Sequence, residues 1–367
     1  MKFISIKAND TLFFRDGRPF SMGDDSFASS IFPPPPSVIY GALRTAYMST
    51  KCENGVDLNK WIPKTEALEL TSILLHDKEN VYFPMPEDLL VLDSNNQLTN
   101  SQFKTIQLEL DLKSSYSNSL TDYQLIKNDK IKGKKIEGQK IISALGLENY
   151  LNKARNPVAW LLSSFYENEM KTGIGRNKLS HVAENGRLYR INTYRPAKEI
   201  GGEIKHLKIQ IGYKGLDDFP NNGILALGGE RRTASFNHLE GIQIDLPNIE
   251  SNRFKIYLST PAVFVTGWYP KSLFEKHDLK LLAANVGSPM HLGGWDFRPK
   301  NNSSILRPQP KPMLQFVPAG SVFYVEAKNI ESAYESARKI HACSISDKIN
   351  DTDYARQGFG IAYIGKI

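Results

Sequence analysis

Four consecutive prolines, Pro33–Pro36, constrain this chain more than any other feature of its sequence. Proline lacks an amide hydrogen and fixes its φ angle, so the run cannot join a helix and sets a sharp start for the helix that follows. Ser37 predicts the N-cap, because its hydroxyl can accept hydrogen bonds from the free amides of the first turn. Apolar residues at helical spacing then predict one buried face, made of Val38, Ile39, Ala42, Leu43, Ala46 and Tyr47.

The opposite side of this predicted helix is polar and carries Tyr40, Gly41, Arg44 and Thr45. The loop before the prolines adds Arg15 and Arg18. Guanidinium and hydroxyl groups are common partners of phosphate oxygens in nucleic acids. The loop and the polar side of the helix together predict an element suited to a phosphate backbone.

Composition bounds the class of protein. The 367 residues permit two domains, and the net charge of +7 favours an anionic partner, although a basic surface alone also explains it. Only two cysteines are present, Cys52 and Cys343, which is too few for a disulfide scaffold. Residues 1–8 lack the apolar core of a signal peptide, and no run of eighteen apolar residues predicts a membrane span. We therefore expect a cytoplasmic protein.

Local patterns predict a mixture of strands and helices. Strands are expected at 2–8, 72–76, 80–83, 207–213, 254–258 and 322–326. Helices are expected at 157–170, 273–284 and 331–340. A strand that is followed by an insertion and a helix is how a ferredoxin-like βαββαβ domain begins. The pattern thus predicts an α+β fold.

The stretch 113–140 interrupts this pattern with serines followed by six lysines between Lys127 and Lys140. It cannot bury much apolar surface, which predicts an inserted, mobile, basic loop. Its lysines suit RNA or a neighbouring subunit, and solvation alone also explains such a run. A polar connector at 244–252 predicts a domain boundary.

In two segments, glycines, which leave the backbone without a side chain, stand next to arginines in the sequence. The residues are Gly173, Gly175, Arg176 and Asn177, and then Gly228, Gly229, Arg231 and Arg232. Glycine lets a backbone amide approach a phosphate closely, and arginine adds a two-pronged clamp. A tight turn with a surface arginine is the alternative, and these residues alone leave both interpretations open.

No arrangement of residues predicts catalysis. None of the seven histidines stands at metal-ligand spacing with a carboxylate or a cysteine, and the sequence holds no phosphate-binding Walker run. A metal-free ribonuclease needs a histidine, or a lysine and a tyrosine, beside the scissile phosphate. We expect no metal, no cofactor and no enzymatic activity.

Distinctive segments run the length of the chain. They begin with Phe14–Phe20, Phe32–Pro36 and Tyr40–Thr45 and continue at 83–90, 184–190, 225–232, 293–296, 311–313, 317–324 and 357–361. Together they resemble one family of RAMP proteins, the third subunit of the Cmr complex, which is the RNA-guided effector of type III-B CRISPR systems. The segment at 357–361 resembles the glycine-rich loop that RAMP proteins carry between the final helix and the final strand.

The resemblance implies two ferredoxin-like, RRM-like domains with long insertions, which would span residues 1–246 and 247–367. It implies a non-catalytic RNA-binding subunit that holds the 5′ repeat-derived tag of the crRNA. The partners would be the large polymerase-like subunit and the first backbone subunit, with target RNA bound only indirectly. Candidate RNA contacts are Arg15, Arg18, Tyr40, Arg44, Thr45, Gly173, Gly175, Arg176, Asn177, Gly228, Gly229, Arg231, Arg232, Trp295, Gly358 and Gly360.

Two other functions fit the sequence. One is a metal-free RAMP endoribonuclease that processes CRISPR repeat RNA. Related endonucleases of this kind commonly keep a histidine early in the chain, whereas here no histidine precedes His76. The other is a subunit that binds only protein and caps the filament.

Overall fold

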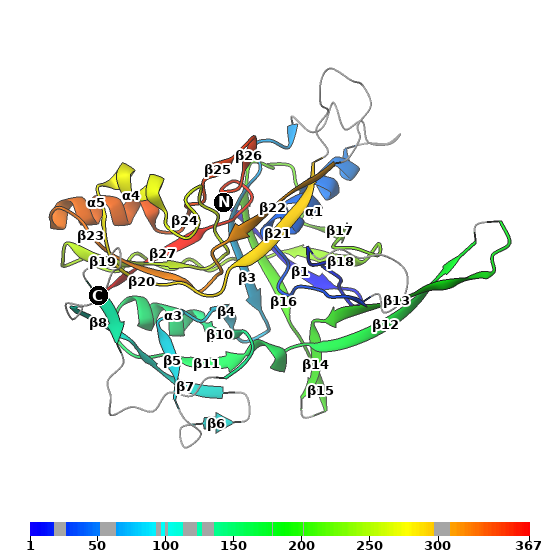
Figure 1. Cartoon of the computed structure of the whole chain (residues 1–367), viewed down its shortest axis with the longest axis horizontal. Helices are drawn as coiled ribbons and strands as arrows, with labels where there is room; N and C mark the ends of the chain where they lie inside the picture. Colours follow the sequence, from blue (N-terminus) through cyan, green and yellow to red (C-terminus); the bar gives the residue numbers. More distant parts are fainter. Residues whose placement is uncertain are drawn as a thin grey trace.

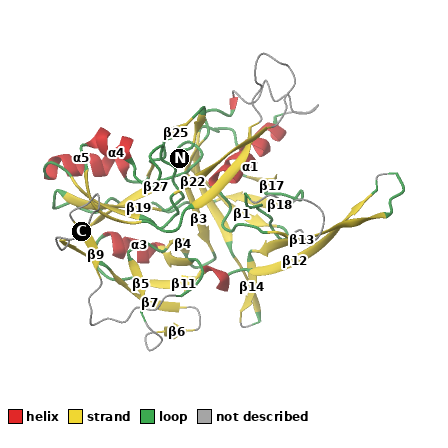
Figure 2. Ribbon diagram, in the orientation of Figure 1, coloured by secondary structure: helices red, strands yellow, loops and turns green. Residues whose placement is uncertain are grey.

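The computed structural model describes residues 1–17, 27–51, 64–92, 97–99, 102–112, 123–126, 136–177, 179–200, 202–296 and 309–367. The chain is an α+β protein built mainly from sheet, which confirms the predicted fold class (Figures 1 and 2). Two sheets form its frame. A long hairpin projects from one end of the molecule, and helices α4 and α5 lie at the other end.

The larger sheet has eleven strands in the described part of the chain. Its order is β17-β18-β1-β16-β3-β4-β10-β11-β7-β5, with β6 paired to β7. The strands are β1 (Lys2–Ala8), β3 (Glu69–His76), β4 (Val81–Pro84), β5 (Leu89–Val91), β6 (Gln97–Thr99), β7 (Gln102–Gln107), β10 (Lys140–Ser143), β11 (Val158–Leu161), β16 (Lys208–Lys214), β17 (Asn222–Ala226) and β18 (Thr233–His238). The predicted strands at 2–8, 72–76, 80–83 and 207–213 all belong to it.

Helix α1 (Pro36–Thr50) confirms the predicted apolar face, because Ile39, Ala42 and Leu43 are buried against this sheet. Its start differs from the prediction. Pro36 already lies in the helix and Pro35 occupies the N-cap, so Ser37 does not cap it. The reason is that the first helical position needs no amide hydrogen, and the fixed φ of proline suits it.

The second sheet has the order β20-β23-β19-β27-β24. Its strands are β19 (Arg253–Leu258), β20 (Lys280–Asn285), β23 (Val322–Glu326), β24 (Cys343–Ser344) and β27 (Ile361–Lys366), and its helices are α4 (Lys271–His277) and α5 (Ile330–Ile340). The predicted helix at 331–340 is α5, and the predicted strands at 254–258 and 322–326 are β19 and β23. Whether the chain divides into domains at 244–252 stays a prediction.

One predicted helix is wrong, and another is shorter than predicted. Residues 157–170 form β11, a 3₁₀ turn at Leu162–Ser164 and the start of strand β12 (Glu167–Arg176). β11 pairs with β10 on one side and β7 on the other, so strand pairing overrides the helical spacing. The helix predicted at 273–284 ends at His277. Asp278 adopts a left-handed backbone there, with φ of 50°, and β20 follows.

The predicted loop at 113–140 is only partly a loop. Strand β8 (Glu109–Leu112) ends just before the predicted loop, and its partner β9 (Tyr123–Ile126) lies within it. Lys140, the last residue of the predicted loop, begins β10. The lysines from Lys127 to Lys135 lie outside the described residues. Helix α3 (Ala144–Leu151) follows, and Ser143 caps it by accepting a hydrogen bond from the amide of Gly146.

The remaining strands form small sheets. The projecting hairpin consists of β12 and β13 (Ala183–Arg195), and β2 (Phe27–Ala28) pairs with β13. The other pairs are β14 (Ala197–Ile200) with β15 (Glu203–His206), β21 (Met290–Asp296) with β22 (Gln309–Phe316), and β25 (Lys348–Ile349) with β26 (Thr352–Asp353).

A buried carboxylate joins the two sheets. Asp88, fully buried, accepts hydrogen bonds from the hydroxyls of Tyr150 on α3, at 2.7 Å, and Tyr324 on β23, at 2.6 Å. Gln107 donates to the same carboxylate at 3.2 Å. Lys255 on β19 is also fully buried, and its Nζ lies 3.4 Å from the centre of the Tyr150 ring. Side chains from both sheets thus share one polar cluster, which we call the Asp88 joint.

Close backbone approaches reinforce this joint. The Tyr257 hydroxyl donates to the carbonyl of Pro84 at 2.6 Å, and the amide of Glu87 donates to the carbonyl of Gly320 at 2.8 Å. Gly320 has φ of +94°, and a Cβ there would lie 2.6 Å from the Met85 carbonyl oxygen. Glycine is needed at this position for both reasons.

We expect Lys255→Met to remove a pH dependence of stability. Burial lowers the pKa of Lys255 to about 7, whereas Asp88 acts in the opposite sense. In the unfolded chain the pKa of a lysine is about 10.4. Between these two pKa values the unfolded state binds more protons than the folded state. The free energy of unfolding of the wild type therefore decreases steadily as pH falls from the unfolded pKa to the folded pKa of about 7.

The measurement is urea unfolding of wild type and variant at pH 7, 8 and 9. The difference in unfolding free energy should shift in favour of the variant as pH falls, by up to about 1.4 kcal/mol per pH unit. Lys276→Met on the exposed side of α4 is the control and should show no such trend. Parallel pH profiles for wild type and Lys255→Met would contradict the burial of a titrating ammonium.

Candidate nucleic-acid interface

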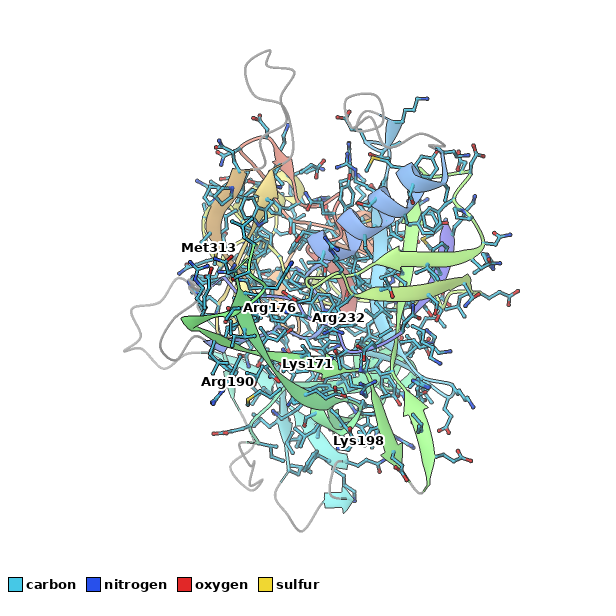
Figure 3. The ribbon with its side chains drawn as sticks, turned by 90° about the vertical axis from the view of Figure 1, so that its right-hand side faces the viewer. Lys171, Arg176, Arg190, Lys198, Arg232 and Met313 are labelled. Atoms are coloured by element: carbon cyan, nitrogen blue, oxygen red, sulfur yellow. The ribbon has the colours of Figure 1, made fainter. Side chains whose placement is uncertain are left out.

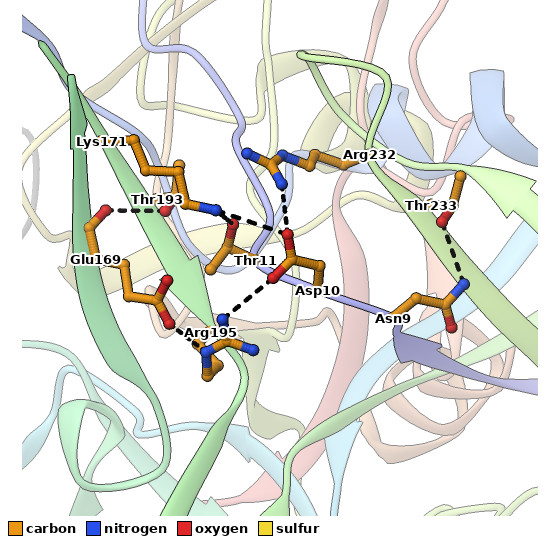
Figure 4. A network of polar contacts seen from close by, with 9 residues as sticks. All are labelled: Asn9, Asp10, Thr11, Glu169, Lys171, Thr193, Arg195, Arg232 and Thr233. Carbon is orange, nitrogen blue, oxygen red and sulfur yellow. Dashed lines mark hydrogen bonds and ion pairs between the residues drawn. The ribbon is translucent and has the colours of Figure 1, made fainter. Parts of the chain in front are cut away.

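Three cationic side chains converge on Asp10, which follows β1 (Figure 4). Arg232 Nη1 lies 2.5 Å from the carboxylate, Arg195 Nη2 lies 3.1 Å from it, and Lys171 Nζ lies 3.6 Å from it. The cations come from the turn between β17 and β18, from β13 and from β12. We call this group the Asp10 cluster.

The environment of Asp10 keeps it charged. A hydrogen bond from the Thr11 backbone lowers the pKa of its carboxyl, the three cations lower it further, and burial opposes them. Lys171 also donates to the Thr11 hydroxyl at 2.8 Å, and Arg195 pairs with Glu169 on the neighbouring strand. The cluster therefore ties the base of the hairpin to the end of β1.

Backbone contacts strengthen the same convergence. Leu12 and Tyr194 exchange hydrogen bonds of 2.7 and 2.9 Å, which adds the N-terminal loop to the edge of β13. The Gly229 amide donates to the carbonyl of Phe13 at 2.8 Å. The N-terminal loop, the hairpin and the Gly228–Gly229 turn, three segments on which the sequence prediction rested, thus meet at one place.

The outer face of the hairpin is exposed and mixes apolar and cationic side chains. Cross-strand partners share a face, so Thr172 with Arg190 and Ile174 with Leu188 form rows on it. Phe27 on β2 is in register with Arg190 and half exposed. Figure 3 shows Lys171, Arg176, Arg190, Lys198 and Arg232 on the side of the molecule that carries the hairpin. Such a surface suits a single-stranded nucleic acid, which binds through phosphates and base stacking.

The turn after β17 is strained. Glu230 and Arg231 have φ of 56° and 54°, and the Arg232 amide donates to the Gly229 carbonyl at 3.3 Å. Positive φ at both central residues defines a type I′ turn, in which Asn and Gly are usual. This backbone conformation costs a non-glycine residue stability. Arg231 is exposed at the tip, whereas Arg232 is held by Asp10.

The residues predicted on the hairpin divide into turn, packing and surface roles. A Cβ at Gly173 would lie 2.2 Å from the Tyr189 ring, so this glycine makes room for a tyrosine. Gly175 lies where the register of the two strands shifts. Asn177 accepts hydrogen bonds from the Leu179 and Ser180 amides and shapes the turn. Arg176 remains exposed, with its Nε donating to the His181 carbonyl at 3.0 Å.

Gly228 and Gly229 pack against the N-terminal loop. A Cβ at Gly228, where φ is +82°, would lie 2.4 Å from the Phe13 carbonyl oxygen, and one at Gly229 would lie 3.0 Å from the Phe13 ring. The Gly229 amide already donates to Phe13. This amide is therefore not available to bind a phosphate as predicted, because its hydrogen is already donated to the Phe13 carbonyl.

The polar side of α1 is partly structural. Arg44 Nε donates to the buried hydroxyl of Thr65 at 2.7 Å, and its guanidinium lies 5.5 Å from the Tyr40 ring centre. Burial raises the pKa of Tyr40, while Arg44 opposes this shift. Thr45 is exposed. Arg44 therefore braces the segment before β3 in addition to any surface contact.

Arg15 and Trp295 are both exposed, on neighbouring parts of the surface. Arg15 forms a backbone bridge with Ser30, and Gly17 lies so near Met313 that a Cβ would be 2.1 Å from its methyl carbon. The N-terminal loop thus lies against the β21–β22 hairpin, which carries Trp295 with 60% of its surface exposed. Arg18 lies outside the described residues.

The predicted contacts at Gly358 and Gly360 are wrong, since both are buried. Their amides donate to the carbonyls of Ala355 and Pro261. A Cβ at Gly358 would lie 2.9 Å from the Leu70 side chain on the other sheet. This loop is a packing element, where small size permits a close approach.

The described histidines and carboxylates form no group of three that could hold a metal ion. His76 bonds to the Ser5 hydroxyl at 2.8 Å, and His341 bonds to the Ile244 carbonyl at 2.8 Å. Burial lowers the pKa of both imidazoles. In the part of the chain that the structure describes, no helix is long and apolar enough to cross a membrane.

Comparison with known families decides the relationship of the chain. The sequence model of the family described as CRISPR-associated protein (Cas_Cmr3) matches residues 4–367. The chain belongs to the Cas_Cmr3 family. This confirms the resemblance to the third subunit of the type III-B Cmr complex, and the chain is a CRISPR effector subunit of that type.

Solved structures include similar chains. One comes from the cryo-EM structure of the Type III-B Cmr-beta bound to cognate target RNA, with 17% identity, 88% of this chain and 86% of that chain covered, and a TM-score of 0.49. Another comes from the crystal structure of the Csm3-Csm4 subcomplex in the type III-A CRISPR-Cas interference complex, with 14% identity, coverage of 90% and 98%, and a TM-score of 0.36. A comparison with curated protein sequences found no match.

Sequence reasoning missed several residues of this Cas_Cmr3 chain. Asp10, Lys171, Arg190, Arg195 and Phe27 were not among the candidate RNA contacts. A signal existed for the hairpin, because basic and apolar residues are interspersed on both sides of the turn near 177–182. Nothing local predicts that Asp10 collects cations from three distant segments.

Asp10→Asn should loosen the base of the hairpin without unfolding the protein. The change keeps the side-chain shape and removes the charge that three cations share. The Asp10 side chain is 47% exposed, so we expect a loss of only about 1 kcal/mol in unfolding free energy. Hydrogen exchange should accelerate at 167–171 and 193–195. Asp218→Asn, which removes a surface pair with Lys51, is the control. Unchanged protection at the hairpin base would show that the cluster does not hold it.

Proposed function

We propose that the chain is a non-catalytic, cytoplasmic RNA-binding subunit of the Cmr complex that holds the 5′ repeat-derived tag of the crRNA. One observation carries the proposal: the N-terminal loop, the β12–β13 hairpin and the β17–β18 turn converge on the Asp10 cluster. From this convergence Arg15, Arg176, Arg190 and Arg231 remain exposed. In this proposal, family segments distant in sequence build one basic surface.

The proposed mechanism is positional. Base pairing by the guide reads the target, while the protein fixes the end of the strand by shape, phosphate contacts and stacking. Arg176, Arg190 and Arg231 supply guanidinium groups for phosphates. Phe27 and the apolar residues on the outer face of the hairpin supply surfaces for bases. The target RNA contacts this subunit only indirectly.

We also propose that the chain contains two ferredoxin-like RAMP domains. In the second sheet, β19-α4-β20-β23-α5-β27 follow one another in a βαββαβ sequence, and the strands lie in the order β20-β23-β19-β27. In the larger sheet, β1-α1-β3-β16-β18 give the same spatial order, β3-β16-β1-β18. The place of the second helix there is taken by residues 215–232, which include β17.

Docking on the large polymerase-like subunit and the first backbone subunit is part of the proposal. An exposed loop supports it, because Val265 and Trp268 are largely apolar and face solvent. The loop is braced: the Val265 amide donates to Asp347 at 2.9 Å, and the Trp268 ring packs edge-on against Tyr269. Rigid aromatic anchors of this kind are frequent at the centres of protein interfaces.

A gel-retention assay separates this proposal from its two rivals. The purified chain is mixed with labelled crRNA and with the same RNA lacking the tag, with and without Mg²⁺. A retained, intact complex that depends on the tag supports the proposal. Cleavage that follows the protein through purification and disappears on mutation of one of its residues would establish an endoribonuclease. No retention would favour a subunit that binds protein alone.

RNA binding should weaken with salt along a modest slope. Each phosphate contact on a single strand releases about 0.7 counterion. A short tag bound by the exposed arginines should therefore give a slope of log affinity against log salt of about −2 to −4. Filter binding between 50 and 300 mM salt measures it, with wild type as reference for the variants below. An affinity independent of salt would mean that stacking, not phosphate contact, dominates.

Arg231→Gly should separate binding from folding. The left-handed backbone at position 231 destabilises the fold by about 1–2 kcal/mol when the residue is not glycine. Glycine removes this cost, but its greater conformational entropy in the unfolded chain lowers stability by about 0.5–1 kcal/mol. Melting should therefore stay equal or rise slightly. Affinity for crRNA should fall about tenfold, because one charge-assisted contact is lost.

Arg231→Lys is the matched control, because it keeps the charge but not the two-pronged donor geometry, and it should lose less affinity. If Arg231→Gly binds crRNA as well as wild type does, the strained turn does not serve RNA.

A further inference from the structure

A small polar cavity lies beside the Asp10 cluster. Its volume is about 260 Å³, and it opens to the surface between the end of β1, the start of β14, β15 and β18. The lining residues are Lys7, Ala8, Asn9, Asp10, Arg195, Pro196, Ala197, His206 and Ser235. Arg195 belongs to both the cluster and the cavity, so the two are continuous.

Two basic side chains in this cavity lack partners. Neither Lys7 Nζ nor the His206 ring forms a hydrogen bond or an ion pair within the described residues. The other polar groups are engaged: Asn9 donates to Thr233 at 3.2 Å, Ser235 donates to the Lys7 carbonyl at 3.4 Å, and Arg195 pairs with Asp10. Lys7 and His206 come from different strands, β1 and β15, and line the same cavity.

The cavity is electropositive. Burial lowers the pKa of His206, and Lys7, Lys208 and Lys78 lower it further from β1, from β16 and from the turn before β4. Among the described residues that line the cavity, Asp10 is the one carboxylate, and three cations share its charge. An anion that enters meets unpaired basic groups and a neutralised acid.

We propose that this cavity binds one phosphate group of a ribonucleotide, with Lys7 as the charge and His206 as a proton-coupled donor. The RNA as source of that phosphate rests on the proposed function, whereas the affinity for phosphate does not. Lysine is a compact cation that binds phosphate oxygens, and a protonated imidazole offers two N–H donors. The dianionic or monoanionic group favours the charged imidazole, so binding takes up a proton.

The groups that face His206 set the sign of this coupling. Lys7, Lys208 and Lys78 repel its proton, while Lys205, the preceding residue on β15, pairs with Glu79 at 3.7 Å. A bound phosphate compensates these cations and raises the pKa of the imidazole. Affinity for a phosphodiester, which keeps one negative charge over this range, should therefore increase as pH falls from 8 to 6.

The first experiment uses inorganic phosphate alone on the full chain. NMR of ¹⁵N-labelled histidine follows the titration of the His206 ring, assigned with His206→Gln. Saturating phosphate should raise the pKa of His206 by about one unit or more, and Lys7→Met should abolish most of the shift. An unchanged titration in wild type at saturating phosphate would overturn the proposal.

The second experiment uses crRNA. Lys7→Met and His206→Gln should each lower affinity about tenfold, and Lys7→Met should reduce the salt slope by about 0.7. His206→Gln should also flatten the rise in affinity from pH 8 to pH 6. Lys205→Met is the control, because this exposed lysine precedes His206 on β15 but does not line the cavity. Thermal melting checks that each variant is folded.

The two experiments distinguish the failures. If phosphate shifts His206 but wild type retains no crRNA, the proposed function is wrong and the phosphate site stands. If crRNA binds wild type and both variants equally, the cavity is not a phosphate site for RNA and the proposed function stands.

Discussion

The buried carboxylate of Asp88 is the interaction on which the frame of this protein depends. A buried charge without donors costs several kcal/mol, and Asp88 finds its donors on both sides of the molecule. Tyr150 belongs to the segment before the second sheet and Tyr324 belongs to that sheet. Tyr150 and Gln107 from the first half and Tyr324 from the second sheet all donate to Asp88, so the two sheets share its hydrogen bonds, and Lys255 is buried between them.

Several segments that relate the chain to its family serve this frame and not a phosphate. Gly320 and Gly358 allow the two sheets to approach, since a Cβ would meet Met85 or Leu70. Gly228 does the same for the N-terminal loop, where a Cβ would meet Phe13. The proposed basic surface comes instead from exposed arginines on the elements that a second carboxylate, Asp10, ties together. One acid fixes the frame, and the other fixes the elements that face the proposed RNA.

Local pattern was enough for β1, α1 and α5, because each buries one face at its own period, and for β23, which is a short apolar run buried on both faces. It failed at 157–170, where helical spacing occurs in a segment that the neighbouring strands hold as β11. It also failed at the glycines, because a phosphate loop and a close backbone contact need glycine for the same reason. Arg176 and Arg231 were predicted and are exposed. Asp10 was missed because its partners lie far away along the chain.

The projecting hairpin has a consequence for how the chain behaves alone. β12 is the outer strand of its small sheet in the described part of the chain, and Met170 and Ile174 lie on it with apolar surface exposed. An open strand edge with apolar side chains is a template for strand addition between molecules. Lys171 and Arg176 oppose this by charge, but RNA or a neighbouring subunit would cover the edge completely. We therefore expect the chain to be more soluble when it is co-expressed with a partner that covers this edge than when it is expressed alone.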